Sequence, residues 1–501
     1  MRNLLIAASA ASLLMVSCTK KNSNTDDTSA NQLSSRALSS NGVLMDGQIH
    51  YIVLSKQQGL SSKLMEKIAA IGSVTSKLDD LGIVVASSSN PGFEQELEKL
   101  AEVQNVVRDI QLDWVKSTLK GDKIVDFDET QSVNESLETS ATLGLSGTNP
   151  FVPLQWSLSS VSAKGAFQAG YKGAGAVVAV LDGGFHLNHP DIVANVIASK
   201  TISFVPGQLP QMANPAAFSH GTHVSGIIAA SDNNIGIAGI APAAKLMLVK
   251  VLGDNGSGAF SWIIQGVYYA ANQGADIINM SLGAALPRNG QFIDNNGTPN
   301  DPTDDVKVSE TKEVQDLIIS MNRAFQYARK KGSLAIVAAG NDGTYVTGQG
   351  QGTFYPANCV DVVTIAANAP NDWALNENTS LFIPSSYTNN GSSLISFAGP
   401  GGDFDASITM ATVAGITRPS YVFDMVLSAG SSTGYSWAAG TSMACPAASG
   451  VAALLVGKYN GNISTSQLES KLKSSAVDLG ARGKDQYFGN GQVNAANVVE
   501  Q

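Results

Sequence analysis

The sequence predicts an α/β fold in which a parallel sheet is covered by helices on both faces, preceded by a smaller α+β unit. Three observations predict it. From Trp156 onward, short apolar runs alternate with segments whose apolar residues recur at helical spacing. The runs are almost continuously apolar, which is typical of parallel strands buried on both faces. A different order of strand and helix patterns precedes them, between His50 and Leu112.

The main unit is expected to alternate strands with helices along the chain. The predicted strands are 177–181, 246–252, 277–280 and 334–338, and the predicted helices are 220–230, 260–273 and 314–329. In a parallel sheet, ligands bind beyond the carboxyl ends of the strands. Asp182 and Asn341 each stand just past a predicted strand. We therefore expect the functional site at that edge of the sheet.

The N-terminal unit shows the order strand, helix, strand, strand, helix, strand. The predicted strands are 50–54, 74–78, 82–86 and 106–112, the second of them weak, and the predicted helices are 60–71 and 93–103. This order fits a small ferredoxin-like α+β unit.

The first residues resemble an export signal. Arg2 precedes the apolar run Leu4–Val16, which is too short to span a membrane as a helix. The sequence Met15-Val16-Ser17-Cys18 is similar to a bacterial lipoprotein cleavage box, in which the cysteine is lipidated. We therefore predict a signal peptide at 1–17, lipidation at Cys18, a disordered polar tether at 18–45, and attachment to a membrane only through the lipid. The alternative is an ordinary signal peptide that happens to contain a cysteine, which would release a secreted protein.

Three further polar segments interrupt the pattern. Residues 117–150 contain six acidic residues and no periodicity, so we expect an exposed linker that is open to proteolysis. The segments 287–311 and 403–436 are long for loops, and loops of this length are usually functional or mobile. The acidic part of the first, 294–305, is expected to be a solvated loop.

Composition narrows the class of protein. The 501 residues are 44% hydrophobic and 14% charged, as in a compact globular protein. The net charge of −10 lacks the excess of basic residues that is typical of proteins that bind nucleic acid. Besides Cys18 the chain has Cys359 and Cys445. A secreted protein can pair two such cysteines, but we favour buried free thiols.

The sequence around Ser442 carries the strongest chemical signal. Gly440-Thr441-Ser442-Met443-Ala444-Cys445-Pro446 opens an apolar helix, and we expect Pro446 in its first turn. Free N–H groups at a helix start can hold a negatively charged oxygen. A lone serine there would be an N-cap. Asp182 after a strand and a histidine at another helix start, His220 or His223, instead suggest an activated nucleophile.

At these residues the chain resembles the subtilisin-like serine peptidases, over roughly Trp156–Val498. The motifs that carry the resemblance are VAVLDGG at 178–184, HGTHVSG at 220–226, VAAGNDG at 337–343 and GTSMACP at 440–446. The resemblance implies that Asp182 is the acid, His220 the base and Ser442 the nucleophile, with Asn341 as the side-chain donor to the oxyanion. His223 and His189 would then be structural, and His186 is expected at the surface. Gly183 departs from the family, which more often has Thr or Ser there, so one hydrogen bond to the acid is lost.

The resemblance also implies a peptide-binding cleft with two backbone rails. These are Gly256-Ser257-Gly258 and Ser281-Leu282-Gly283, whose glycines allow close approach of a polypeptide substrate. Phe354 would form the floor of the first specificity pocket, which suggests small or medium side chains. Asp342 on the rim would favour basic ones, so the preference stays open.

A structural Ca²⁺ site follows from the same resemblance. The loop from Ser231 to Ile237 is similar to the family's calcium loop, with Asp191 as the matching carboxylate. The implied ligands are Asp191, Asn233 and backbone oxygens of Ser231, Ile235 and Ile237. Oxygen-only ligation suits this hard cation. A hydrated Asn-rich turn is the alternative.

The resemblance implies that residues 46–116 are an inhibitory propeptide and that 151–501 form the peptidase domain. The precursor would cut itself within the linker, between Lys116 and Leu154. We expect a monomeric, exported endopeptidase whose partners are its substrates and its own propeptide. A catalytically silent, peptide-binding relative is the alternative, and a processing protease with one dedicated substrate is a third possibility.

Overall fold

The computed structural model describes residues 48–115, 124–127, 139–287, 289–294, 306–309, 311–346, 352–405 and 407–501. The predicted signal peptide, the lipidation site Cys18 and the tether 18–45 lie outside the described residues. Within the described part, no helix is both long enough and apolar enough to cross a membrane.

The N-terminal unit has the predicted ferredoxin-like order. Its elements are β1 (Ile49–Ser55), α1 (Ser62–Ile71), β2 (Ser73–Leu78), β3 (Ile83–Ser88), α2 (Phe93–Glu98) and β4 (Val103–Arg108), and its antiparallel sheet runs β2-β3-β1-β4. Tyr51 and Val53 of β1 pack on the two helices, whereas Ile52 and Leu54 belong to a core shared with the main unit. Both faces of β1 are therefore buried.

The central sheet of the main unit is mainly parallel, as predicted. Its strand order is β18-β17-β15-β11-β7-β9-β8, with β19 also paired to β17, and only β18 runs antiparallel. The bounds are β7 (Val177–Asp182), β8 (Ile202–Ser203), β9 (Lys245–Lys250), β11 (Ile277–Met280), β15 (Leu334–Ala338), β17 (Val362–Ala369), β18 (Ile383–Pro384) and β19 (Phe397–Pro400).

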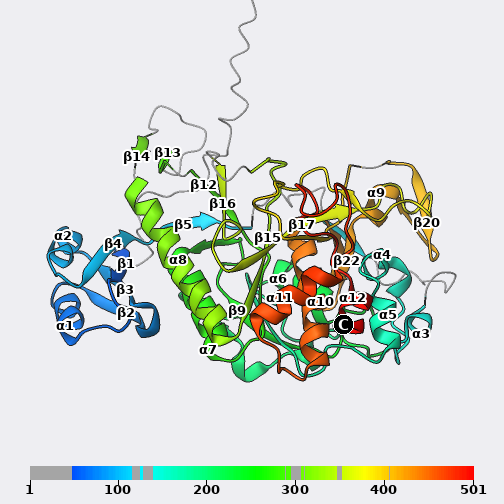
Figure 1. Ribbon diagram of the computed structural model, residues 1–501, viewed down its shortest axis with the longest axis horizontal. Helices are drawn as coiled ribbons and strands as arrows, with labels where there is room; N and C mark the ends of the chain where they lie inside the picture. Colours follow the sequence, from blue (N-terminus) through cyan, green and yellow to red (C-terminus); the bar gives the residue numbers. More distant parts are fainter. Residues whose placement is uncertain are drawn as a thin grey trace, which may run out of the picture. The chain divides into compact units, whose positions relative to one another are not determined.

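Helices cover both faces of this sheet (Figure 1). Val178 and Val180 of β7 belong to the core with α6 (His220–Ala229) and α10 (Thr441–Lys458). Ala179 and Leu181 belong to the opposite core, with α7 (Phe260–Asn272) and α8 (Thr311–Lys331). Alternate residues of one strand thus enter different cores, which explains the continuous apolar runs. The remaining helices are α3 (Ser140–Leu143), α4 (Trp156–Ser160), α5 (Ala163–Gln168), α9 (Ser420–Asp424), α11 (Thr465–Ser475) and α12 (Ala495–Glu500).

The segments predicted as long loops contain regular structure. β13 (Gln291–Asp294) pairs with β14 (Val306–Ser309) in the first segment, and β20 (Met410–Val413) with β21 (Ile416–Pro419) in the second. Just before the first segment, β12 (Ala284–Pro287) pairs with β16 (Gly352–Tyr355). β22 (Val426–Ala429) and β23 (Tyr435–Ala438) form a hairpin that leads into α10.

The linker also departs from the prediction, because it contains the strand β6 (Ile124–Phe127). β6 pairs antiparallel with β23, and Phe127 is 5% exposed. The Phe127 ring packs edge-on against Phe151 and Trp437. Burial of this ring against distant parts of the chain explains a strand in a segment without periodicity.

Cys359 and Cys445 are buried free thiols, as predicted. Burial raises the pKa of both thiols, which keeps them protonated and unreactive.

Candidate active site

Asp182 and His220 form a hydrogen-bonded pair at the carboxyl edge of the sheet. Asp182 ends β7 and is fully buried, and His220 begins α6. Nδ1 of His220 lies 2.9 Å from both carboxylate oxygens of Asp182. Nε2 of His220 is buried and has no hydrogen-bond partner in the part of the chain that the structure describes. The imidazole is thus held by the acid on one side and left able to accept a proton on the other.

The backbone after Asp182 supplies a further hydrogen bond to the carboxylate. The Gly183 N–H donates to Asp182 Oδ1 at 2.7 Å. Glycine has no hydroxyl, so one side-chain hydrogen bond to Asp182 was expected to be lost at this position. The main-chain donor remains, so the carboxylate is still fixed from this side.

The other described histidines near α6 are structural. His223 is fully buried, its Nε2 lies 2.9 Å from Ser436 O, and burial lowers its pKa to about 3. His189 Nε2 lies 3.2 Å from Gly434 O, and burial lowers its pKa to about 4. The prediction that His186 lies at the surface is wrong, since its ring is buried with Nε2 2.9 Å from Ala217 O.

Ser442 lies in the first turn of α10, which packs against α6. Its hydroxyl donates to Ser281 O at 3.1 Å, and its own carbonyl oxygen accepts from Ser281 Oγ at 2.9 Å. This second bond explains Pro446, which sits in the second helical turn rather than the first. The proline lacks the N–H that would bond Ser442 O, and the Ser281 hydroxyl takes its place.

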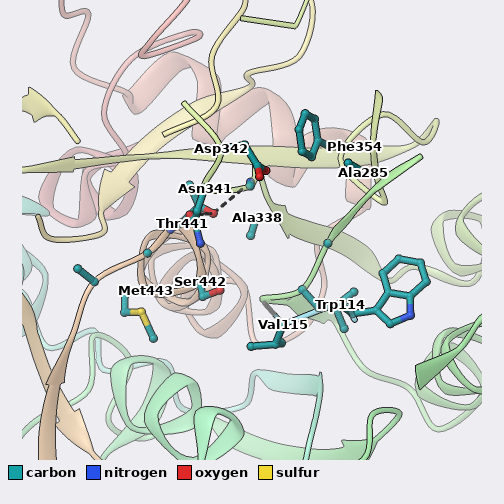
Figure 2. Close-up of a pocket in the computed structure, with 15 residues that line it drawn as sticks. Trp114, Val115, Ala285, Ala338, Asn341, Asp342, Phe354, Thr441, Ser442 and Met443 are labelled. Atoms are coloured by element: carbon teal, nitrogen blue, oxygen red, sulfur yellow. Dashed lines mark hydrogen bonds between the residues drawn. The ribbon is translucent and has the colours of Figure 1, made fainter. Parts of the chain in front are cut away.

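Asn341 follows β15, and its amide is oriented by Thr441. Asn341 Oδ1 accepts from the Thr441 N–H at 2.9 Å and from Thr441 Oγ1 at 2.8 Å. With the oxygen engaged, the Nδ2 group is the end available to a ligand. Asn341, Thr441 and Ser442 line one pocket together with the buried Phe354 (Figure 2).

A segment of the N-terminal unit occupies the predicted cleft. β5 (Gln111–Asp113) pairs antiparallel with β10 (Ser257–Ala259) on one rail. The N–H groups of Trp114 and Val115 donate to Gly256 O at 3.1 and 3.2 Å.

The second rail holds the same segment from the other side. The Gly283 N–H donates to Trp114 O at 2.8 Å, and Leu282 lines the pocket beside Val115. Trp114 and Val115 line the same pocket as Ser442 (Figure 2). Both rails therefore bind an extended peptide in the structure.

The predicted cation loop encloses the side chain of Asn149. Its Nδ2 lies 3.0 Å from Ser231 O, 2.9 Å from Ile235 O and 2.7 Å from Ile237 O, and 3.4 Å from Asn233 Oδ1. Oδ1 of Asn149 is buried and has no hydrogen-bond partner among the described residues. The fully buried Asp191 accepts from Asn233 Nδ2 and from the Ile237 N–H. Nothing in the sequence around Asn149 distinguished it from the other polar residues of the linker.

Among the described residues, no group of three or more His, Cys, Asp and Glu side chains is arranged to hold a metal ion. The loop around Asn149 instead presents carbonyl and amide oxygens.

The fold and this site define a class: a serine hydrolase of the subtilisin type, with an α/β core and a cleft that binds extended peptide. The model of the Subtilase family matches residues 173–491. Subtilisin E of Bacillus subtilis (strain 168) is 31% identical over 345 residues, covering 69% of this chain and 71% of that protein. Thermitase of Thermoactinomyces vulgaris is 30% identical over 331 residues, covering 66% and 90%.

Among solved structures, the epidermin leader peptide processing serine protease from Staphylococcus aureus has a TM-score of 0.64 and 20% identity, covering 90% of this chain and 98% of that one. This likeness concerns the fold alone. The chain belongs to the subtilase family and is a subtilisin-like serine endopeptidase.

Proposed function

We propose that this peptidase is exported, anchored by a lipid on Cys18, and cleaves polypeptides with Asp182, His220 and Ser442. The observation that carries the catalytic assignment is the Asp182–His220 pair, whose Nε2 is buried and unpartnered. A serine hydroxyl is a weak nucleophile until an imidazole accepts its proton. His220 is the base available for this step.

The reaction would proceed in three steps. Nε2 of His220 takes the Ser442 proton as Oγ attacks the substrate carbonyl, while Asp182 holds the tautomer and stabilises the imidazolium. The carbonyl oxygen becomes negative and accepts from Asn341 Nδ2 and the Ser442 N–H. The imidazolium then protonates the leaving amine, and water repeats the sequence on the acyl-enzyme.

A fluorophosphonate probe tests the catalytic assignment. Fully processed wild-type protein should be labelled at Ser442, and the variants Ser442→Ala and His220→Ala should not. Asp316→Asn, a change in α8 outside the proposed machinery, serves as the control and should still be labelled. Absence of labelling in the processed wild type would overturn the assignment.

We also propose that the N-terminal unit is an inhibitory propeptide. It contributes β5 to the cleft and rests on the two helices that cover one face of the sheet. Asp109, which is 4% exposed, accepts the Ser261 N–H in the first turn of α7 at 3.0 Å. A carboxylate at a helix N-terminus is favourable.

Further polar contacts hold the unit against α8. Arg323 Nη2 donates to Gln104 Oε1 at 2.6 Å, and Tyr327 donates to Asp80 at 2.9 Å. The unit would therefore stay bound after a single cut, and would leave only when it is itself degraded.

The positions of β5 and β6 narrow the proposed maturation site. Val115 occupies the cleft, whereas Ile124 begins a strand of the peptidase sheet. We therefore expect the cut upstream of Ile124, within the N-terminal part of the predicted interval from Lys116 to Leu154. N-terminal sequencing of the mature enzyme should find Ile124–Phe127 retained, and Ser442→Ala should remain uncut. A mature N-terminus beyond Phe127 would contradict this placement.

The Asn149 side chain is surrounded by oxygens of Ser231, Asn233, Ile235 and Ile237, which we call the oxygen cage. This cage supports the proposed Ca²⁺ site. An amide nitrogen has two hydrogens, but four acceptors surround this one, and Asn149 Oδ1 is left without a donor. Turning the amide by 180° would bring five oxygens together, an arrangement that suits a hard cation. Asn149, Ser231, Asn233, Ile235 and Ile237 would hold Ca²⁺, with Asp191 beside them as the charged neighbour.

Calcium removal tests this site. Adding EGTA to the Ser442→Ala protein should lower Tm, and Ca²⁺ but not Mg²⁺ should restore it, because the larger ion accepts this irregular cage. Asn149→Ala should abolish the response. A Tm that is insensitive to EGTA would show that the amide itself fills the loop.

A further inference from the structure

An ion pair joins the end of β9 to the loop that leads into one of the peptide-binding rails. Lys250 is the last residue of β9 and lies in register with Asp182 on the neighbouring strand. Its side chain is 0% exposed, and its ammonium group pairs with the carboxylate of Asp254, which is 26% exposed. A buried ammonium group requires such a partner, since burying an unpaired charge is strongly unfavourable.

The Asp254 carboxylate connects three segments that meet at the cleft. Oδ1 contacts Lys250, and Oδ2 accepts the Ala213 N–H at 3.0 Å. Gly184 also approaches so closely that a Cβ there would overlap Asp254 Oδ1. The carboxylate therefore links the end of β9, the segment around Ala213 and the turn that follows Asp182.

The loop that contains Asp254 carries the acceptor for the bound peptide. It closes on itself through Gly253 N–H to Ser257 O at 2.8 Å and Gly256 N–H to Gly253 O at 2.9 Å. Gly256 O receives the N–H groups of Trp114 and Val115, and β10 follows directly. Its backbone is also tied to the acid, because the Val251 and Leu252 N–H groups donate to Asp182 O.

We propose that Asp254, held by Lys250, is a positioning residue that fixes this rail relative to Asp182 and so sets the affinity for extended peptides. Neither side chain is among the residues that line the pocket beside Ser442. They act through Gly256 O and β10, which hold the peptide backbone. The pair should therefore matter for binding any sequence, because the rail contacts main-chain atoms.

The test compares kcat and KM on an internally quenched peptide with the sequence of residues 111–121. Asp254→Ala should raise KM about tenfold and change kcat less than twofold. A displaced rail binds the peptide backbone less tightly in the ground state and the transition state alike, whereas the reacting groups stay in place. The Ki of the unlabelled peptide 111–115 should rise by the same factor. Asp254→Glu should restore part of the affinity.

A second variant separates positioning from stability, since Asp254→Ala leaves a buried ammonium unpaired. Lys250→Met combined with Asp254→Leu removes both charges, and apolar replacements of buried ion pairs are often neutral for stability. Tm in the Ser442→Ala background should recover, whereas KM in the active enzyme should stay raised. Recovery of both, or a KM unchanged in all variants, would overturn the proposal.

Arg329→Met is the control variant. Arg329 is 24% exposed and pairs with Glu469 and Asp361, at the opposite end of β15 from Asn341. It should lower Tm without changing KM. The inference rests on the proposed triad only for the activity readout. An inactive wild type would refute the triad, whereas an active wild type with unchanged KM in the variants would refute the role of Asp254.

Discussion

Two helices begin at the active site, and their N-termini differ in how the first N–H groups are used. α6 begins after Ser219, whose hydroxyl accepts the Thr222 N–H at 3.0 Å and donates to Gly184 O. α10 begins after Gly440, which has no side chain to cap the helix. The described residues provide no acceptor for the Ser442 N–H. The serine cap of α6 engages the third N–H of that helix. In α10, Asn341 Oδ1 engages the first N–H, that of Thr441, and the Ser442 N–H is left open for a ligand.

The two helix starts show where the chain gives up some helix stability. A glycine at the N-cap lowers helix stability by only roughly a few tenths of a kcal/mol relative to serine. The open N–H of Ser442 is the group that the proposed mechanism needs for the oxyanion. The predictions below probe the two helix starts and their surroundings, beginning with the substitution that should act most strongly.

Asn341→Ala removes the side-chain donor beside the open end of α10. We expect kcat to fall about 10²- to 10³-fold with KM little changed, a range measured on a subtilisin, which is a relative of this chain. Steady-state kinetics checks this on the processed enzyme. Thr344→Ala, a nearby change that leaves the Asn341 amide in place, is the control. An equal loss in both variants would mean that the amide has no special role.

Acid should destabilise the region around α6 through its buried histidines. Burial holds the pKa of His223 at about 3 and that of His189 at about 4 in the folded protein, against about 6.5 when unfolded. The unfolded chain therefore binds more protons below pH 6.5. The stability that these neutral rings contribute is complete above that pH and is lost as pH falls toward the folded values. The loss is at most about 1.4 kcal/mol per pH unit for each histidine.

Urea unfolding of the Ser442→Ala protein between pH 7 and 4.5 measures this slope. His223→Gln keeps a donor for Ser436 O but does not titrate, so it should flatten the slope. The pKa values of Asp109 and Asp424 shift in the opposite direction to those of the histidines, because burial raises each carboxyl pKa to about 6. Both carboxyls are present in parent and variant alike. The difference between parent and variant therefore isolates the histidine. Identical slopes would contradict the assignment.

Gly440→Ser would close the open helix start. A serine N-cap accepts from the second or third N–H of the helix, and the second belongs to Ser442. We expect a gain in stability of a few tenths of a kcal/mol relative to glycine. We also expect a several-fold lower kcat, since the new hydroxyl competes with the oxyanion. Kinetics and Tm measured together decide this, and higher Tm with full activity would refute the competition.

Ser219→Ala removes the N-cap side chain of α6, which accepts the Thr222 N–H. Losing an N-cap should cost about 1 kcal/mol of stability. The catalytic constant should change little at 25 °C, because Asp182 still holds His220. A change in kcat larger than the change in stability would show that the cap orients the base.

Much of this architecture could be predicted from the sequence because its signals are local. The alternation of apolar runs gave the sheet and its helices, and the motifs around Asp182, His220, Asn341 and Ser442 marked the residues of the candidate site. Lys250 lies within the predicted strand 246–252, but the apolar pattern of that strand did not single it out. Its partner lies four residues away, outside that strand, in a loop that periodicity does not reveal.

What escaped prediction depends on distant contacts. Pro446 fits the second turn of α10 because Ser281, 165 residues earlier in the chain, bonds the carbonyl that the proline leaves free. β6 exists because β23 and the Phe151 ring receive it. Asn149 lies in the oxygen cage because the linker folds back onto that loop. None of these contacts leaves a periodic trace in the local sequence.

The pairing of β6 has a consequence for handling the protein. β23 has β22 along one side and β6 along the other, so its main-chain hydrogen-bonding groups meet strands on both sides. An uncovered strand edge is a template for aggregation between molecules. A recombinant peptidase that begins after Phe127 would expose that edge and should precipitate, whereas one that begins upstream of Ile124 should stay dispersed.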